Sequence, residues 1–223
     1  MTDLTARVVL AHRSSLVRLE GRQWQLGAQE RLVVAGGGQI EVEGEADIAC
    51  LDTSEAVRLL AFMDHGLNFD RRGQRGESAA IATIEMVEEP GRLLQWITAL
   101  RVNNDQGADA LFNFWAATEP YNLVRFVLAE FGKGQSVQEL AHRYGLSTAH
   151  FRRKCRQGLG RSIKTEMRLL RARQSLMEYS TGQNTMTSVA VNNGYCSLSH
   201  FCSDIKSLLG VAPREVFQVI RRD

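Results

Sequence analysis

Two stretches of equal length decide the fold: "HFRRKCRQGLG" at residues 150–160 and "HFCSDIKSLLG" at residues 200–210. Both begin with His-Phe and end with Leu-Gly, but the first carries four Lys and Arg residues and the second carries one. In each stretch an apolar residue recurs every four positions, which predicts the buried stripe of a helix that ends at the glycine. The stripes are Phe151, Cys155 and Leu159 in the first stretch, and Phe201, Ile205 and Leu209 in the second.

The repeat extends upstream, because residues 137–145 align with residues 186–194. Ala141 and Ala190 occupy matching places where a small side chain lets two helices approach closely. Gly145 and Gly194 occupy the turns, where glycine accepts a left-handed backbone. Ser136 followed by Glu139 predicts a capping box before the first helix, and Ser147 is placed to cap the next one. We therefore predict two helix-turn-helix units. A plain helical hairpin is the alternative for either copy alone.

The segment between the copies, residues 162–180, predicts one long amphipathic helix. Its predicted apolar stripe consists of Ile163, Met167, Leu170 and Met177, with three arginines, Arg168, Arg171 and Arg173, on other faces. A rigid spacer of this kind suits two recognition helices that enter successive major grooves of DNA, which lie roughly 34 Å apart.

Charge separates the two halves of the chain. Residues 1–118 hold 11 Arg and no Lys against 17 Asp and Glu, a net charge of −6, whereas residues 119–223 hold 16 Lys and Arg against 8 acids, a net charge of +8. Between Arg143 and Arg173 there are ten basic residues and a single acid, Glu166. A charge run is often only a solvated face, but this concentration within one predicted domain favours a polyanionic partner, double-stranded DNA.

The outward faces of the second helices supply the candidate DNA contacts. The expected base contacts are Ala149, Arg152 and Arg153 in the first unit, and Leu198, Ser199, His200 and Ser203 in the second. Arginine suits bidentate contact with guanine, and the second face would read thymine methyl groups partly through apolar contact. The expected phosphate contacts are Arg156, Arg161, Lys164 and Lys206. His150 and His200 have capping or packing as an alternative role.

The first half predicts a small antiparallel sheet followed by helices. Strands are expected in residues 7–12, 15–21, 31–44 and 47–52, with a hairpin turn at Gly36–Gly38. Helices are expected at residues 54–66, capped by Thr53 or Ser54, at 90–102 and within 107–118, and residues 68–78 read as a polar loop. Residues 79–89 fit a strand or a helix. The fold class is therefore α+β: residues 1–118 form an acidic mixed domain, and residues 119–223 form an all-α domain of two helix-turn-helix units joined by a long helix.

Several function classes are disfavoured. No apolar run reaches the roughly 18 residues that span a bilayer, and the polar N-terminus does not resemble a signal peptide, so we expect a cytoplasmic protein. The four cysteines form no CxxC pair and read as reduced thiols. A zinc site built from Cys196, His200 and Cys202 fits no closed ligand spacing. No nucleophile–base pair, phosphate loop or cofactor motif emerges, so we expect neither an enzyme nor a cofactor.

Residues 119–223 resemble the DNA-binding domain of the AraC/XylS family of transcription regulators. The resemblance rests on Ala141 with "GLS…HF", on Arg171-Ala172, and on "GY…HF…IK…LGVAP" within residues 190–213. The phrases "AHFRRKC", "AVNNGYCSLSHF" and "SDIKSLLGVAPRE" are similar to the branch that activates type III secretion genes, the invasion-regulator group. Two features depart from the family pattern: Cys155 and Ile205 replace an aromatic residue, and the final helix, residues 213–222, lacks a tyrosine-arginine pair.

The resemblance implies a sequence-specific activator that acts on RNA polymerase together with a secretion chaperone as co-activator. The acidic half, residues 1–118, would then bind a protein partner or form a homodimer. The alternative is a regulator that responds to a small molecule bound by the N-terminal domain, although about 50 residues of strand are few for the usual barrel of that kind.

Overall fold

The computed structural model describes residues 4–71, 78–84, 87–132 and 135–220, and the chain divides into two units, residues 1–129 and 130–223. The division falls near the end of helix α4 (Glu119–Glu130) rather than before it. Most of α4 packs within the first unit, because Leu123, Val124 and Val127 are buried and Tyr121 donates a hydrogen bond to Asp64.

Two antiparallel sheets, rather than one, form the strand region of the first unit. One sheet has the order β6-β1-β4-β7 and the other the order β3-β2-β5. The strands are β1 (Thr5–Ala11), β2 (Ser15–Leu19), β3 (Arg22–Leu26), β4 (Arg31–Gly36), β5 (Ile40–Glu43), β6 (Ala46–Asp52) and β7 (Ser78–Thr83). Apolar side chains of both sheets form one buried cluster: Val9, Ala11, Val17, Leu19, Leu26, Leu32 and Val34. Strand β3 was not predicted from the sequence.

The prediction of a hairpin at Gly36–Gly38 is wrong. Strands β4 and β5 belong to different sheets, so the glycines carry the chain from one sheet to the other. Gly36 and Gly38 adopt positive φ angles of 95° and 90°. The Arg7 guanidinium donates hydrogen bonds to the carbonyl oxygens of Gly36, Gly37 and Gly38 at 3.2, 2.7 and 2.8 Å. A strand-to-strand crossover and a hairpin need the same glycines, and only long-range pairing distinguishes them.

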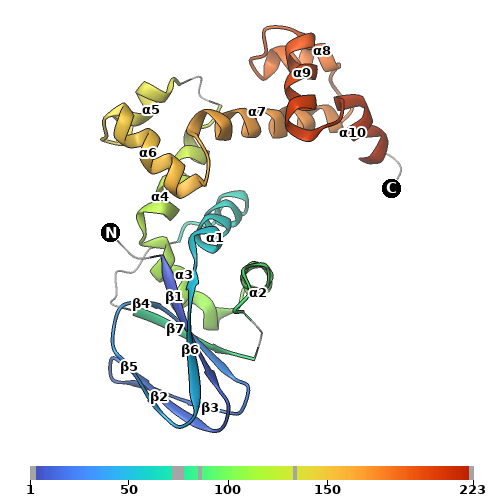
Figure 1. The fold of residues 1–223 in the computed structure, drawn as a ribbon. Helices are drawn as coiled ribbons and strands as arrows, with labels where there is room; N and C mark the ends of the chain where they lie inside the picture. The colour runs from blue at the N-terminus through green and yellow to red at the C-terminus, as the bar shows by residue number, and fades with distance from the viewer. Residues whose placement is uncertain (1–3, 72–77, 85–86, 133–134, 221–223) are drawn as a thin grey trace. The chain divides into compact units, whose positions relative to one another are not determined.

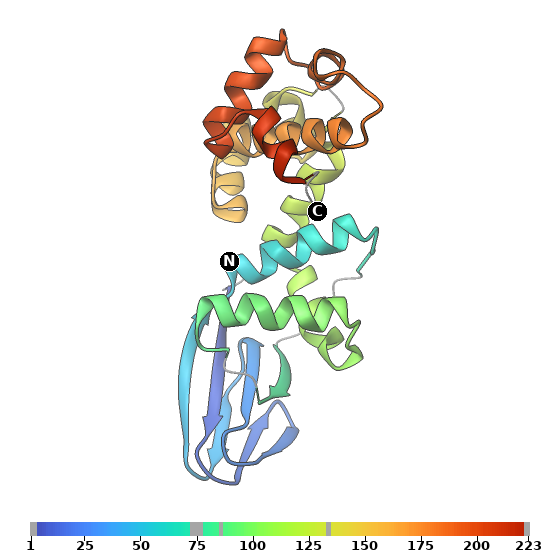
Figure 2. The same cartoon turned by 90° about the vertical axis from the view of Figure 1, so that its right-hand side faces the viewer.

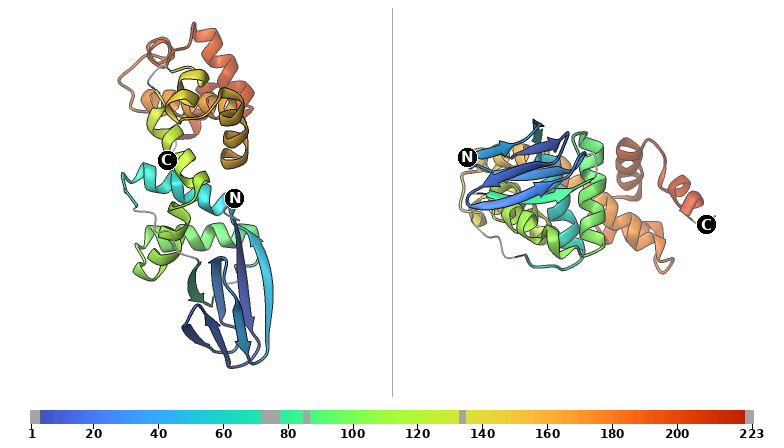
Figure 3. Two further views of the ribbon diagram at one scale, coloured as in Figure 1. Left: turned by 90° about the vertical axis from the view of Figure 1, so that its left-hand side faces the viewer. Right: turned by 90° about the horizontal axis from the view of Figure 1, so that it is seen from below.

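The predicted helices of the first unit are confirmed as α1 (Ser54–Gly66), α2 (Pro90–Val102) and α3 (Asp109–Ala116), with a short 3₁₀ turn η1 at Gln106–Ala108. Figures 2 and 3 show these helices gathered at one end of the strands. The side chain of Thr53 does not cap α1; its hydroxyl donates to the Leu4 carbonyl at 2.6 Å. The described part of the predicted polar loop is partly buried, since the Arg71 side chain is 4% exposed and pairs with Asp64.

The second unit is wholly helical among its described residues, and the α+β fold class is confirmed. Helices α5 (Val137–Arg143) and α6 (Thr148–Leu159) form the first helix-turn-helix, and α8 (Met186–Asn192) and α9 (Leu198–Leu209) form the second. Helix α7 (Ile163–Ser180) connects them, and α10 (Pro213–Ile220) follows α9. Figure 1 shows the two helical hairpins at opposite ends of α7.

Two predicted apolar stripes need correction. The buried face of α7 consists of Ile163, Glu166, Ala172 and Ser175, whereas Met177 is 58% exposed. In α9, Leu209 is 47% exposed, and Leu208 packs against the core in its place. Residue spacing alone predicted that larger side chains face inward. Helix α7 instead packs against α6 near one end and against α8 and α9 near the other, and its buried residues there are the small Ala172 and Ser175.

The residues that the structure describes contain neither a membrane-spanning helix nor a metal site. None of the helices there combines the length and apolar character needed to cross a membrane. Likewise, among the residues whose positions are described, no three His, Cys, Asp or Glu side chains are placed to share a metal ion.

Candidate nucleic-acid interface

The same local chemistry builds both second helices, α6 and α9. The Ser147 hydroxyl accepts a hydrogen bond from the His150 backbone N–H at 3.3 Å, and the Ser197 hydroxyl accepts one from the His200 backbone N–H at 3.1 Å. The turns before them contain Gly145 and Gly194 with φ of 78° and 73°, where a Cβ atom would be strained. The repeated letters of the sequence therefore encode two copies of one capped turn.

The capping box at the start of α5 is also confirmed. Ser136 Oγ accepts from the Glu139 backbone N–H at 3.2 Å, and Glu139 Oε2 accepts from the Ser136 backbone N–H at 2.7 Å. These two bonds to Ser136 lower the pKa of the Glu139 carboxyl. The box fixes the entry of the chain into the first helix-turn-helix unit.

Helix α6 divides its side chains between core and surface as predicted. Phe151, Cys155 and Leu159 are at most 1% exposed, and burial raises the pKa of the Cys155 thiol to about 12. Ala149, Arg152, Arg153 and Arg156 all lie on the exposed side. The predicted base-contact residues of the first helix-turn-helix therefore share an outward face with the predicted phosphate contact Arg156.

Helix α9 presents a less charged outward face. Its exposed residues include the predicted contacts Ser199, His200, Ser203 and Lys206. Leu198 is only half exposed, because it packs against the buried cluster of Ala172, Ala190, Tyr195, Phe201 and Ile205. The His200 ring meets the Tyr195 ring edge-on at 5.4 Å between centroids. His200 thus combines exposure with a packing contact, so both roles considered for it are compatible with its position.

An acid that the sequence analysis did not single out anchors α9 to α7. Asp204 is 8% exposed, forms an ion pair with Arg168 and accepts a hydrogen bond from the Tyr195 hydroxyl at 3.2 Å. Burial, followed by the neighbouring Asp204 carboxylate, raises the pKa of Tyr195 to about 12. Arg168 and Asp204 lie 36 residues apart in the chain. The spacing of residues within one helix therefore gives no indication of this pair.

A second acid holds the start of the second helix-turn-helix, helices α8 and α9. The Glu178 carboxylate, near the end of α7, accepts hydrogen bonds from three side-chain amides. These belong to Asn184, Asn192 and Asn193, at 3.0, 2.8 and 2.7 Å. Charge-assisted bonds of this kind are stronger than neutral ones, so they orient α8 relative to α7. The "NN" of the quoted phrase "AVNNGY" is therefore a structural clamp.

Four basic side chains of the predicted interface gather around one hollow. A pocket of about 390 Å³ between α6 and the start of α7 is lined by Val137, Arg152, Arg153, Arg156, Ser162, Ile163 and Lys164. Arg161 is not among these lining residues; its Nε lies 3.2 Å from the carboxylate of Glu166, which is 6% exposed. The structure thus brings Lys164 to the recognition helix and ties Arg161 to a buried acid.

Comparison with known proteins adds independent evidence. A family model described as a helix-turn-helix domain matches residues 140–218. Invasion protein InvF of Salmonella typhi and of Salmonella typhimurium is 31% identical over 183 residues, which cover 81% of this chain and 85% of InvF. The chain belongs to the AraC/XylS family, in its invasion-regulator branch.

Two further similarities are narrower. Transcriptional regulator MxiE of Shigella flexneri is 35% identical over 119 residues, which cover 52% of this chain and 57% of MxiE. Among solved structures, ToxT of Vibrio cholerae aligns over 95% of this chain and 86% of its own at 12% identity, with a TM-score of 0.41. That score is too low for ToxT to support any argument about this protein.

Membership of this family makes the chain a DNA-binding transcription regulator and not an enzyme. The two capped helix-turn-helix units are the elements that bind DNA in such proteins. Which side chains contact bases and which contact phosphates remains a prediction from their positions.

Proposed function

We propose that this regulator activates type III secretion genes in the cytoplasm, by binding promoter DNA with both helix-turn-helix units and recruiting RNA polymerase with a secretion chaperone as co-activator. The observation that carries the proposal is the pair of exposed faces on α6 and α9, held in equivalent capped turns at the two ends of one helix. The similarity to InvF supports the assignment of the target genes.

The two faces would divide recognition unequally. Arg152 and Arg153 would contact guanine edges from α6, with Ala149 beside them, and Arg156 and Lys164 would hold phosphates. On α9, Ser199, His200 and Ser203 would read the second half-site with the exposed part of Leu198, and Lys206 would hold a phosphate. The cationic side chains around the hollow beside α6 support a larger electrostatic contribution from the first helix-turn-helix than from the second.

The first unit is proposed as the site of protein contact, either with the chaperone or with a second copy of the chain. Residues 1–118 carry a net charge of −6, which disfavours direct contact with DNA. The space between its two sheets is filled by the seven-residue apolar cluster. A protein partner bound at the surface is therefore favoured over a ligand held between the sheets.

Selection from a pool of random 30-base-pair duplexes, followed by footprinting of the full chain, tests the proposal. We expect one enriched sequence with two protected half-sites about one helical turn apart. Footprints and promoter-driven transcription would be compared with and without a co-expressed type III secretion chaperone. Enrichment of no sequence would refute sequence-specific binding. Transcription that is activated equally without the chaperone would refute the co-activator role alone.

The alternative, a regulator that responds to a small molecule, has one specific observation in its favour. An open pocket of about 450 Å³ in the first unit is lined by residues of β7 and α2 together with Glu30, Ile84, Asn103 and Asp105. A small metabolite that raises the Tm of the full chain and changes its footprint, where the chaperone does neither, would favour this alternative.

A further inference from the structure

Three cationic residues of α7 lie on one face of this helix. Lys164, Arg168 and Arg171 are spaced at i, i+4 and i+7, so they fall within about 60° of one another around the axis at 100° per residue. Arg173 lies on the opposite face by the same geometry and is exposed.

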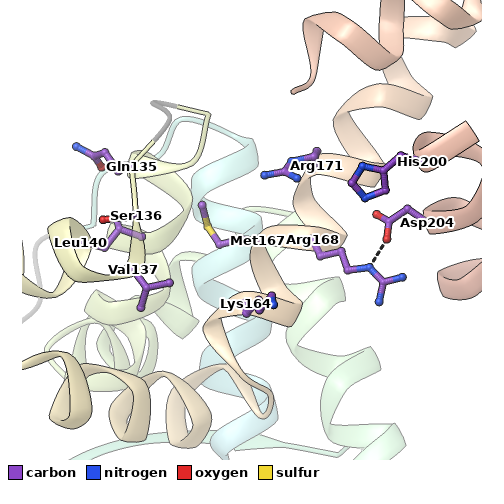
Figure 4. Close-up of a pocket in the computed structure, with 10 residues that line it drawn as sticks. All are labelled: Gln135, Ser136, Val137, Leu140, Lys164, Met167, Arg168, Arg171, His200 and Asp204. Carbon is purple, nitrogen blue, oxygen red and sulfur yellow. Dashed lines mark hydrogen bonds and ion pairs between the residues drawn. The ribbon is translucent and has the colours of Figure 1, made fainter. Parts of the chain in front are cut away.

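The cationic face of α7 forms the floor of a pocket of about 570 Å³. Figure 4 shows Lys164, Met167, Arg168 and Arg171 projecting from α7, with α5 on one side and α9 on the other. The walls are Gln135, Ser136, Val137 and Leu140, at the start of the first helix-turn-helix, and His200 and Asp204 from α9. The pocket therefore lies between the two helix-turn-helix units.

The lining of this pocket carries an excess of positive charge. Its one acid, Asp204, forms an ion pair with Arg168, and these two charges compensate each other. Arg171 lies over the Tyr195 ring, with its guanidinium carbon 5.6 Å from the ring centroid. Lys164 is exposed. Two cationic groups without an acid in the lining to balance them therefore face the pocket, and an anion is the ligand that such a site favours.

The pocket is continuous in its lining with the predicted reading faces. Lys164 and Val137 also line the hollow beside Arg152, Arg153 and Arg156 of α6, and His200 belongs to the exposed face of α9. When α6 and α9 occupy successive major grooves, the DNA between them presents its sugar-phosphate backbone to the protein. Lys164 and Arg171 are about 10 Å apart along the helix axis, at 1.5 Å per residue. They can therefore meet different phosphates.

We propose that Lys164 and Arg171 of α7 bind backbone phosphates of the DNA segment between the two half-sites, so that the connecting helix contributes to DNA binding as well as to spacing. The inference rests on the proposed function, which already assigns Lys164 to a phosphate, and adds to it Arg171 and the segment of DNA that the two side chains contact. Arg168 is assigned to structure, because it holds Asp204.

Affinity measurements on the duplex enriched in the selection, at several salt concentrations, test the inference. Lys164→Gln and Arg171→Gln should each reduce the slope of log affinity against log salt by about 0.9 and weaken binding roughly fivefold at 0.15 M salt. The enriched sequence should not change, since phosphates carry no sequence information. Arg173→Gln removes the same charge from the opposite face of the same helix, and it should change the slope far less.

A duplex with uncharged methylphosphonates at the phosphates between the half-sites locates the contact. On this duplex the wild type should lose affinity, and Arg171→Gln should cause no further loss. Equal losses from Arg171→Gln on both duplexes would overturn the inference, as would equal effects of Arg171→Gln and Arg173→Gln. If Arg171→Gln unfolds residues 130–223, Lys164→Gln replaces it in both comparisons, because the Lys164 side chain is exposed.

Three other outcomes are distinguishable. If inorganic phosphate without DNA raises the Tm of the wild type but not of Arg171→Gln, the pocket binds a free anion and the inference is wrong. If the wild type enriches no sequence at all, the proposed function fails. If it enriches a sequence but the methylphosphonate duplex binds normally, only the role of α7 fails.

Discussion

Replacing Asp64 with alanine should strongly destabilise the first unit. Asp64 is fully buried in α1 and accepts three hydrogen bonds from other segments. The donors are Arg101 Nε at 2.7 Å, Arg71 Nε at 3.2 Å and the Tyr121 hydroxyl at 2.9 Å. The side chains of Arg71 and Arg101 are themselves only 4% and 7% exposed. One buried carboxylate thus pairs with two buried cations, and only Arg71 has a second acid, Asp109 at 3.1 Å, among the ion pairs found in the described residues.

The magnitude follows from what the substitution leaves behind. Alanine at position 64 would leave the Nε–H groups of Arg71 and Arg101 and the Tyr121 hydroxyl without the acceptor they share, although Arg71 would keep its ion pair with Asp109 at 3.1 Å. Removing one partner of a buried ion pair costs about 3–5 kcal/mol of unfolding free energy. The total free energy of unfolding of a domain of this size is roughly 5–15 kcal/mol. Tyr121→Phe removes a single hydrogen bond and should cost about 1 kcal/mol. The same carboxylate, after burial, raises the pKa of Tyr121.

The assay can report on the first unit alone. All three tryptophans of the chain, Trp24, Trp96 and Trp115, lie in residues 1–129. Urea unfolding of the full chain followed by tryptophan fluorescence therefore measures this unit. Asp47→Ala is the matched control, because Asp47 is 79% exposed and pairs with His12 at 2.8 Å. It should cost less than about 1 kcal/mol. Equal midpoints for Asp64→Ala and Asp47→Ala would refute the argument that Asp64 holds the unit together.

Three further outcomes are expected. Arg152→Ala should weaken binding to the enriched duplex by about 1–3 kcal/mol and relax preference at one base position; equal weakening on random DNA, measured by titration, would reduce Arg152 to a phosphate contact. Gly145→Ala should destabilise the second unit by about 1–2 kcal/mol in thermal unfolding followed by circular dichroism, because φ there is 78° although the space around it is open. At pH 8 a thiol reagent should label the exposed Cys50 quickly and Cys155 only on unfolding, because burial holds the pKa of Cys155 at about 12 and only the thiolate reacts. Labelling of both cysteines at one rate would contradict the buried position of Cys155.

The helical elements could be predicted closely from local signals. Helices α1 and α2 begin and end at their predicted bounds, and the capping box at Ser136 formed as expected. These signals lie within one or two turns of the chain, where hydrogen bonds between near neighbours decide the structure. The outward position of Arg152 and Arg153 followed from the same periodicity.

The strand region and the clamps could not be predicted in the same way. The crossover at Gly36–Gly38 depends on which strands pair, and the pairs of β4 lie in β1 and β7. The acceptor roles of Asp64, Glu178 and Asp204 depend on partners distant in the chain. Periodicity also assigned Met177 and Leu209 inward, although both are exposed. In each case the deciding contact joins residues whose separation leaves no local pattern.

The repeated phrases at residues 150–160 and 200–210 by themselves determined two helices and the unequal charge of their faces, because helix periodicity is a short-range property of the chain. Together with the capping and turn residues before them and with residues 171–172 and 211–213, they indicated the family. Only the tertiary structure decided which cations share a surface. Lys164 and Arg171 face a pocket beside His200, whereas Arg161 is tied to Glu166 and Arg168 to Asp204. Helical spacing places a charge on a face of its own helix, but its partners come from other helices, and packing alone brings those together.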